Sequence, residues 1–456
     1  MHTVFENIIP RLIDLWTRSG TFENFGTDEE DYRLSKTVWT AIGEACAKSG
    51  DTIPAAFGRR VPNLSAKRSE SSAESNMLFA ILLGPAILRN RFRNITYHHH
   101  FVKLVALVNK CMSWTITTED LDFIREGFAK WVQEYEKLYY RNDPTRLRAC
   151  TLPLHALLHI ADDIVAMGPV WCYWAFVMER FIGALKRANL SLRFPWSSFN
   201  RHVVEVAQLA QIKTLYGLRD ALNLSERHDN IAKGTRYDGY PGLVFARPRR
   251  VEALSTVYQN KIGTYLSILF DIPEDVVRRT MQGERFEQWG RMQQFDDMRG
   301  GDLVRANEIG RQSELITRNA SYVKFHTYLD RWNWNRPTIR FSNEQITLFG
   351  RAERFVVIDL AFIRRLCVDN RVPVPRNQNP VVLAVVSAFP ALKRIADSGL
   401  IEYKLTSGKL AQAELVDVRD IECLIGRVKT SSASYVIDRE SLVGRLDQLD
   451  VTMRAH

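Results

Sequence analysis

The spacing of apolar residues changes along this chain, and this change constrains the fold more than any other feature. Before residue 225, apolar residues recur at a helical period, as Ile8, Leu12 and Leu15 do within residues 4–18. After residue 320 they alternate with polar residues, and β-branched and aromatic residues become frequent. The order of the two patterns predicts the α+β class, with an N-terminal all-helical region followed by a β-rich domain.

The sequence predicts three parts. Residues 1–225 are expected to form the helical region, residues 226–319 a linker with short helices, and residues 320–456 a small β-rich domain, barrel-like or built on a strongly bent sheet. Helices are predicted over residues 4–18, 31–47, 76–92, 98–113, 118–140, 153–167, 171–189 and 198–218. Thr117 or Thr118 can cap the helix that begins at 118, and Gly168 with Pro169 separates two others.

Composition restricts the class of protein. The chain has 456 residues, of which 46% are hydrophobic, and its net charge of +10 suits either a nucleic-acid partner or an ordinary basic surface. Its six cysteines lack the CxxC spacing of a zinc knuckle. The N-terminus lacks a secretory signal, and the longest apolar run, residues 77–88, is shorter than the roughly 20 residues that span a bilayer. We therefore expect an intracellular protein without a membrane segment.

The segment GPVWCYWAFVMERFIGALKR, residues 168–187, places one carboxylate between aromatic residues and cations. At about 100° per residue, the apolar side chains of this helix gather opposite Glu179, whereas Gly183 and Lys186 lie beside it. The aromatic residues at 171–176 predict that the start of the helix is buried. Glu179 then has two interpretations. It is part of a solvated face near Lys186, or it is a metal ligand at the edge of a packed core, where a low dielectric strengthens its attraction for a cation.

The preceding helix carries a second candidate metal site. His155, His159 and Asp163 recur at i, i+4 and i+8 and so share one face, with Asp162 adjacent. Two histidines at this spacing can chelate a transition metal, but a half-buried structural role is an equal alternative. The HEXXH motif is absent because position 156 is Ala. The consecutive histidines at 98–100 cannot converge on one ion, and we expect them to be surface or capping residues.

These residues resemble a known family. The segment from residue 152 to 189 is similar to the part of CACTA-type (En/Spm) transposon transposases that runs from a histidine-bearing helix through GP to ERF and LK. The matching residues are His155, His159, Gly168, Pro169, Trp174, Glu179, Arg180, Phe181, Gly183, Leu185 and Lys186. Met178 departs from the pattern, which has an aromatic or small residue there. Softer matches extend the resemblance over about residues 50–440.

The resemblance implies a DDE-type DNA transposase with an RNase H-like core. In such a core, three carboxylates hold two Mg²⁺ or Mn²⁺ ions for in-line phosphodiester displacement. Glu179 matches the third acid, and the adjoining cations Arg180, Lys186 and Arg187 are candidates for contacts to DNA phosphates. The resemblance also implies transposon ends as the DNA partner and a nuclear location. Residues 1–225 correspond to the C-terminal part of the core with helical additions.

The first two acids of the set are not identified in this sequence. In the family they lie on strands of the core sheet, whereas everything before Leu152 is predicted as helix or loop. We therefore expect the C-terminal portion of a transposase, associated with DNA, catalytically incomplete alone and without a tightly bound metal.

Two alternatives remain open. The first is a metal-dependent nuclease or transposase that recruits Asp162, Asp163 or acids from another chain. The second is a domesticated binding module for nucleic acid or protein, whose β-rich domain would hold a protein partner through the segment DRWNWNR at 330–336.

Overall fold

The structure is a computed structural model. It describes residues 2–66, 70–188, 191, 193–218, 221–222, 234–295, 301–309, 318–328, 345–374, 379–405, 409–410 and 413–439. The chain divides into two compact units, each built from two separate stretches of sequence. The first comprises Met1–Leu12 and Leu107–Asp229, and the second comprises Ile13–Ala106 and Asn230–His456. The boundaries fall within α1 (Ile9–Thr17) and α5 (Thr96–Cys111), so each unit receives part of both helices.

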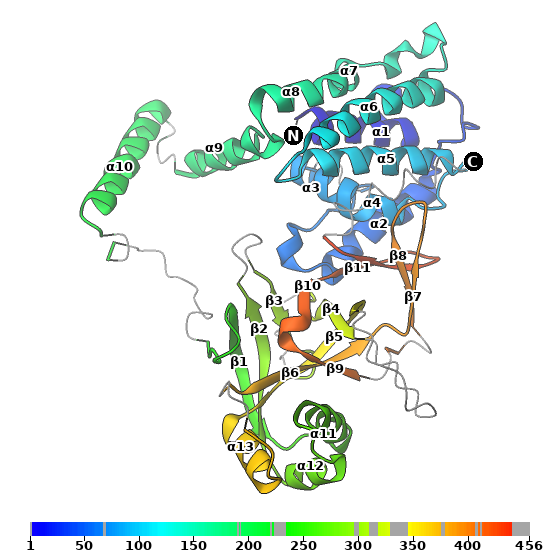
Figure 1. Ribbon diagram of the computed structural model, residues 1–456. Coiled ribbons are helices and arrows are strands. Elements are labelled where there is room, and N and C mark those ends of the chain that lie inside the picture. The colour runs from blue at the N-terminus through cyan, green and yellow to red at the C-terminus, as the bar shows by residue number, and fades with distance from the viewer. Residues whose placement is uncertain are drawn as a thin grey trace. The chain divides into compact units, whose positions relative to one another are not determined.

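The secondary-structure elements among the described residues of the first unit are helices (Figure 1). Besides its parts of α1 and α5, the unit contains α6 (Thr118–Tyr135), α7 (Leu152–Ala156), α8 (Ile160–Met167), α9 (Phe176–Ala188) and α10 (Pro195–Leu215). Short 3₁₀ and π-helical segments are η1 (His2–Ile8), η6 (Glu136–Tyr140), η7 (Pro144–Ala149), η8 (Leu157–His159) and η9 (Val170–Cys172).

Helix α6 shows how the sequence specifies these helices. Thr117 accepts a hydrogen bond from the backbone of Asp120, whose carboxylate accepts one from the backbone of Thr117, so the predicted cap is a complete capping box. The buried side chains recur at helical spacing: Ile124, Phe128, Trp131, Val132 and Tyr135. The cap and the spacing of the buried side chains both indicate this helix, and its predicted start at 118 is confirmed.

The N-terminal stretch of the second unit is also helical. Its helices are α2 (Lys36–Thr52), α3 (Ala73–Leu78) and α4 (Gly84–Ile87), with η2 (Gly20–Phe22), η3 (Ala55–Phe57) and η5 (Phe79–Leu83). The helix predicted over 31–47 begins later, because Ser35 caps it by accepting from Val38. Trp16 and Phe101 are fully buried, with ring centroids 5.5 Å apart. The apolar run at 77–88 also belongs to the core, since Phe79, Leu83 and Ile87 are almost completely buried.

Strands occur in the second unit, among the described residues after 242. They are β1 (Leu243–Glu252), β2 (Phe286–Gln294), β3 (Leu303–Arg305), β4 (Tyr322–Tyr328), β5 (Gln345–Ile358), β6 (Val381–Ala388), β7 (Ala391–Arg394), β8 (Ile401–Lys404), β9 (Ala413–Asp417), β10 (Ile421–Leu424), β11 (Gly426–Lys429) and β12 (Ser434–Ile437). An eight-stranded sheet has the order β1-β2-β5-β4-β10, with β3 beside β2 and with β6 between β5 and β9. A four-stranded sheet has the order β11-β12-β8-β7, and all recorded pairings are antiparallel.

The α+β prediction is confirmed, with a helical N-terminal half and a sheet-rich C-terminal part. The predicted barrel is wrong as far as the described strands go, because they form two open sheets. Residues 226–319 are predicted to be a linker with short helices. Their described part does contain two helices, Thr256–Phe270 and Glu274–Met281, but β1, β2 and β3 also lie there and belong to the eight-stranded sheet. Glycine, proline and charge suggested a linker, but the arginines of β1 lie on an edge strand, where exposed charge is ordinary.

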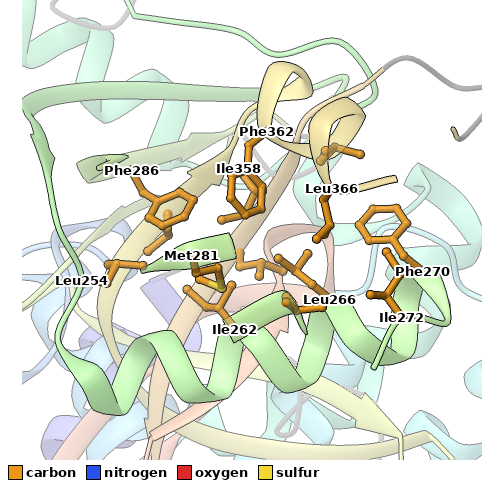
Figure 2. Close-up of a cluster of buried hydrophobic side chains, with 14 of the residues drawn as sticks. Leu254, Ile262, Leu266, Phe270, Ile272, Met281, Phe286, Ile358, Phe362 and Leu366 are labelled. Carbon is orange, nitrogen blue, oxygen red and sulfur yellow. The ribbon is translucent and has the colours of Figure 1, made fainter. Parts of the chain in front are cut away.

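One face of the eight-stranded sheet packs against three helices (Figure 2). They are α11 (Thr256–Phe270), α12 (Glu274–Met281) and α13 (Leu360–Asp369), and a short 3₁₀ segment, η10 (Val418–Asp420), follows β9. Ile262 and Leu266 of α11 contribute to the buried cluster beneath Ile358 of β5. Each such side chain stabilises the fold by about 1.5–3 kcal/mol.

The described helices were also compared with the dimensions of a bilayer. No single one of them is long and apolar enough to cross a membrane. One bent pair, Leu152–Met167 with Val170–Ala188 at 72°, has the combined length and composition.

Candidate functional site

The break before α9 follows the sequence closely. Gly168 ends α8 with a φ of +84°, a conformation that favours glycine, and Pro169 follows it with a φ of −54°. Helix α9 then runs from Phe176 to Ala188 and places Glu179 in its first turn, where a negative charge suits the helix dipole. Lys186 and Arg187 lie in the last turn, where a positive charge suits it.

The apolar face of α9 is not buried as predicted. None of the helix's described residues is buried, and Val177, Met178 and Phe181 are each more than half exposed. An amphipathic pattern indicates that one face of a helix can be buried, but the rest of the fold decides whether another surface packs against that face. A side chain added at Gly183, which lies beside Glu179 on the helix, would meet nothing within 4 Å.

The aromatic run before α9 is more exposed than predicted. Trp171 and Tyr173 are exposed, and Trp174 is half-buried. Trp171 packs on Trp114 with ring centroids 5.1 Å apart and donates to its carbonyl oxygen at 3.2 Å. Trp171 therefore links the run to the segment after α5 through a stacking contact near the surface.

Glu179 meets residues that the sequence did not suggest. Its Oε1 lies 3.6 Å from Nε2 of His2, and the other nitrogen of that ring contacts the carboxylate of Glu6. One ligand atom from each of the three residues lies within 4.8 Å of the other two, and all three residues are exposed. One imidazole and two carboxylates form a donor set that suits Zn²⁺ or Mn²⁺. Exposure weakens such a site, because solvent screens its charges.

The sequence carried part of the signal for this group. His2 and Glu6 are four residues apart, a spacing that brings side chains together on a helix. Nothing in the sequence pairs them with Glu179, since the contact joins residues far apart in the chain. The predicted proximity of Glu179 and Lys186 yields no ion pair among the described residues.

The three cations of α9 are exposed. Arg180, Lys186 and Arg187 have no carboxylate within ion-pair distance in the part of the chain that the structure describes. Lys130, another exposed cation of the first unit, by contrast contacts Glu126 at 3.1 Å. The charge of α9 is therefore available to an anionic ligand.

His155 and His159 lie together, as their spacing predicted. Their Nε2 atoms are 3.2 Å apart, and both side chains are exposed. Two imidazoles on a tetrahedral Zn²⁺, with bonds of about 2.0–2.1 Å, place their nitrogens about 3.3 Å apart. The spacing of the pair suits a metal chelate and equally a hydrogen bond between the two rings, and its exposure argues against the alternative of a half-buried structural role.

The structure does not bring Asp162 and Asp163 to Glu179. Asp162 accepts a hydrogen bond at 3.0 Å from Arg125 of α6. Asp163 lies near Tyr173, whose pKa is raised by burial and, to a lesser degree, by this carboxylate. Among the described residues, neither acid joins a group of three metal-ligating side chains.

Two of the histidines at 98–100 are not surface residues, contrary to the prediction, and the third, His99, is half-buried. His98 and His100 are buried, because α5 lies inside the fold, and His98 Nε2 lies 2.8 Å from the Pro85 carbonyl oxygen. Nε2 of His99 lies 3.4 Å from Oδ2 of Asp397. The burial of His98 and His100, and the contact of His98 with Pro85, account for these two residues as parts of the core without a bound ligand.

The segment 330–336, predicted to hold a protein partner, lies outside the described residues.

Comparison of the chain with protein-family models, curated proteins and solved structures gives no match.

Proposed function

We propose that this chain is a transposase-derived protein that binds DNA through α9 and does not catalyse strand transfer alone. The observation that carries the proposal is the set of cations Arg180, Lys186 and Arg187, exposed and without a carboxylate partner among the described residues. A cation already paired with a carboxylate must give up that contact to bind a phosphate. Among the described residues, the cations of α9 have no such contact to lose, and DNA affinity depends mainly on phosphate contacts.

The spacing of the cations supports a backbone contact. Arg180 and Arg187 are seven residues apart, which places them on one side of the helix and about 10.5 Å apart along its axis. They can therefore reach different phosphates of one strand. Contacts of this kind position a protein on DNA without reading its sequence. The proposed partner is transposon-end DNA in the nucleus, following the resemblance of the GP, ERF and LK residues.

Catalytic incompleteness follows from the acids. A two-metal transposase site needs three converging carboxylates, whereas the group around Glu179 contains one imidazole and two glutamates. The described residues before Leu243 contain no strand on which the first two acids of an RNase H-like core would lie. Under this proposal, residues 1–225 correspond to the C-terminal part of that core, and the missing acids are not provided by this chain. Under this proposal, Mg²⁺ or Mn²⁺ binds only when the two missing acids are supplied from outside this chain.

The proposal is tested by measuring duplex binding as a function of salt. Fluorescence anisotropy is recorded for the wild type and for a variant with Arg180, Lys186 and Arg187 changed to Gln. If all three contact phosphates, the slope of log K against log [salt] falls by about 3, since each contact contributes about 0.9. The matched control removes three exposed, paired cations elsewhere: Lys48→Gln, Lys130→Gln and Arg279→Gln. Equal slopes for the variant and the wild type would refute the role of α9.

A metal-dependent nuclease is the second candidate, and the group of His2, Glu6 and Glu179 favours it. We expect no nicking of a labelled duplex in Mg²⁺ or Mn²⁺ by the wild type. Nicking that depends on the metal and is lost in Glu179→Gln would replace the first proposal with this one.

A further inference from the structure

Two arginines face each other across neighbouring strands of the eight-stranded sheet. In the antiparallel register of β2 and β3, Arg291 lies directly opposite Arg305, and both are half-buried. Directly opposed residues project from the same face of a sheet, with Cβ atoms about 4.5–5.5 Å apart. Their neighbours Met292 and Val304 form the next register pair and are completely buried on the opposite face. The two guanidinium groups thus lie on the face of the sheet opposite to Met292 and Val304.

This arrangement is unfavourable by itself. Like charges directly opposed across strands are destabilising. Within the described residues, no carboxylate lies within ion-pair distance of either arginine, and Nε of Arg305 is buried without a hydrogen-bond partner. Burial, and secondarily the charge of Arg291, lowers the pKa of Arg305. A guanidinium loses solvation here without gaining a counter-ion from the described part of the chain.

Two other arginines of the same sheet, Arg249 and Arg354, have carboxylate partners. Arg249 of β1 contacts Glu287 and also lies over the Trp289 ring, 5.8 Å from its centroid. Arg354 of β5 contacts Glu308. Arg291, by contrast, is opposite the small Ala246 on its β1 side, which adds no charge.

We propose that Arg291 and Arg305 form a binding site for an oxyanion of the phosphate class, supplied by a nucleic-acid phosphodiester or by a free phosphate. The planar guanidinium groups offer several N–H donors that match phosphate oxygens and bind them in a bidentate manner. An anion between them replaces repulsion with two charge-assisted contacts and provides acceptors for their N–H groups. This site lies in the second unit and does not depend on the function proposed for α9.

The first experiment compares phosphate with chloride. Thermal unfolding of the full chain is followed in sodium phosphate and in sodium chloride of equal ionic strength. We expect phosphate to raise the melting temperature of the wild type, and the shift to disappear in Arg291→Gln and, independently, in Arg305→Gln. The control Arg250→Gln removes an exposed arginine on β1 whose register partner is Gln288, and it retains the shift. In chloride, the two test variants melt at or above the wild-type temperature, because repulsion is relieved.

Titration calorimetry with phosphate then gives affinities. Each test variant binds at least about tenfold more weakly than the wild type, equivalent to about 1.4 kcal/mol. A fluorescent single-stranded oligonucleotide separates the two sources. Oligonucleotide binding that is lost in both variants and competed by phosphate identifies a phosphodiester, whereas phosphate binding without such oligonucleotide binding identifies a free phosphate. The proposal is overturned if phosphate has no specific effect on the wild type, or if both variants keep the wild-type response.

Discussion

A buried histidine should make the stability of this protein depend on pH. His98 of α5 is completely buried, and its Nε2 lies 2.8 Å from the Pro85 carbonyl oxygen. A carbonyl oxygen only accepts, so Nε2 carries the proton of the neutral ring. Nδ1 is buried without a hydrogen-bond partner in the described residues. Protonation would place both a charge and an unsatisfied N–H inside the fold.

The size of the effect follows from the pKa of His98. This pKa is lowered from 6.5 to about 4, mainly by burial and less by Arg89 and His99, while the bond to Pro85 and the charge of Asp397 oppose the decrease. The unfolded chain takes up a proton below about pH 6.5, whereas the folded chain stays neutral at this position down to about pH 4. Stability is therefore full above pH 6.5 and decreases as the pH falls towards 4. At 1.36 kcal/mol per pKa unit, the loss is about 3 kcal/mol.

The matched variant is His98→Gln, whose side-chain amide can still donate to Pro85 but does not titrate. The free energy of unfolding in urea is measured for both proteins between pH 8 and pH 4. Other groups titrate alike in the two proteins, so the difference isolates His98. We expect the wild type to lose about 3 kcal/mol more than the variant over this range. Parallel curves, or an NMR titration that places the pKa of His98 near 6.5, would refute the reasoning.

Two further predictions concern the core and the histidine pair. Leu266→Ala in the cluster beneath the sheet should lower the free energy of unfolding by about 2–5 kcal/mol in urea, whereas Leu269→Ala, on the exposed side of the same helix, should change it by less than about 0.5 kcal/mol; equal losses would contradict the burial. Zn²⁺ at a hundred times its dissociation constant should stabilise the wild type by about 2.7 kcal/mol. That shift should vanish in His155→Ala and in His159→Ala, and a shift unaffected by both changes would place the ion elsewhere.

Several features were predictable because their causes are local. The capping box at Thr117 depends on residues three apart, and the break at Gly168 depends on two neighbouring residues. The contact between His155 and His159 follows from one helical turn. The alternation of residues after 320 likewise identified strands, because side-chain direction in a strand reverses at every residue.

The remainder required contacts between distant residues. The sequence determined that α9 would be amphipathic and would carry Glu179 beside cations, but only the tertiary structure decided that its apolar face stays exposed and that His2 and Glu6 meet Glu179. The same holds for Arg291 and Arg305, since strand register brings them together. Helical and strand periods are properties of short segments. Whether an apolar face is covered, and which residues of two strands lie opposite each other, depends on which segments pack together. The alternation of residues therefore identified strands, and the packing of the chain decided that they form two open sheets and not a barrel.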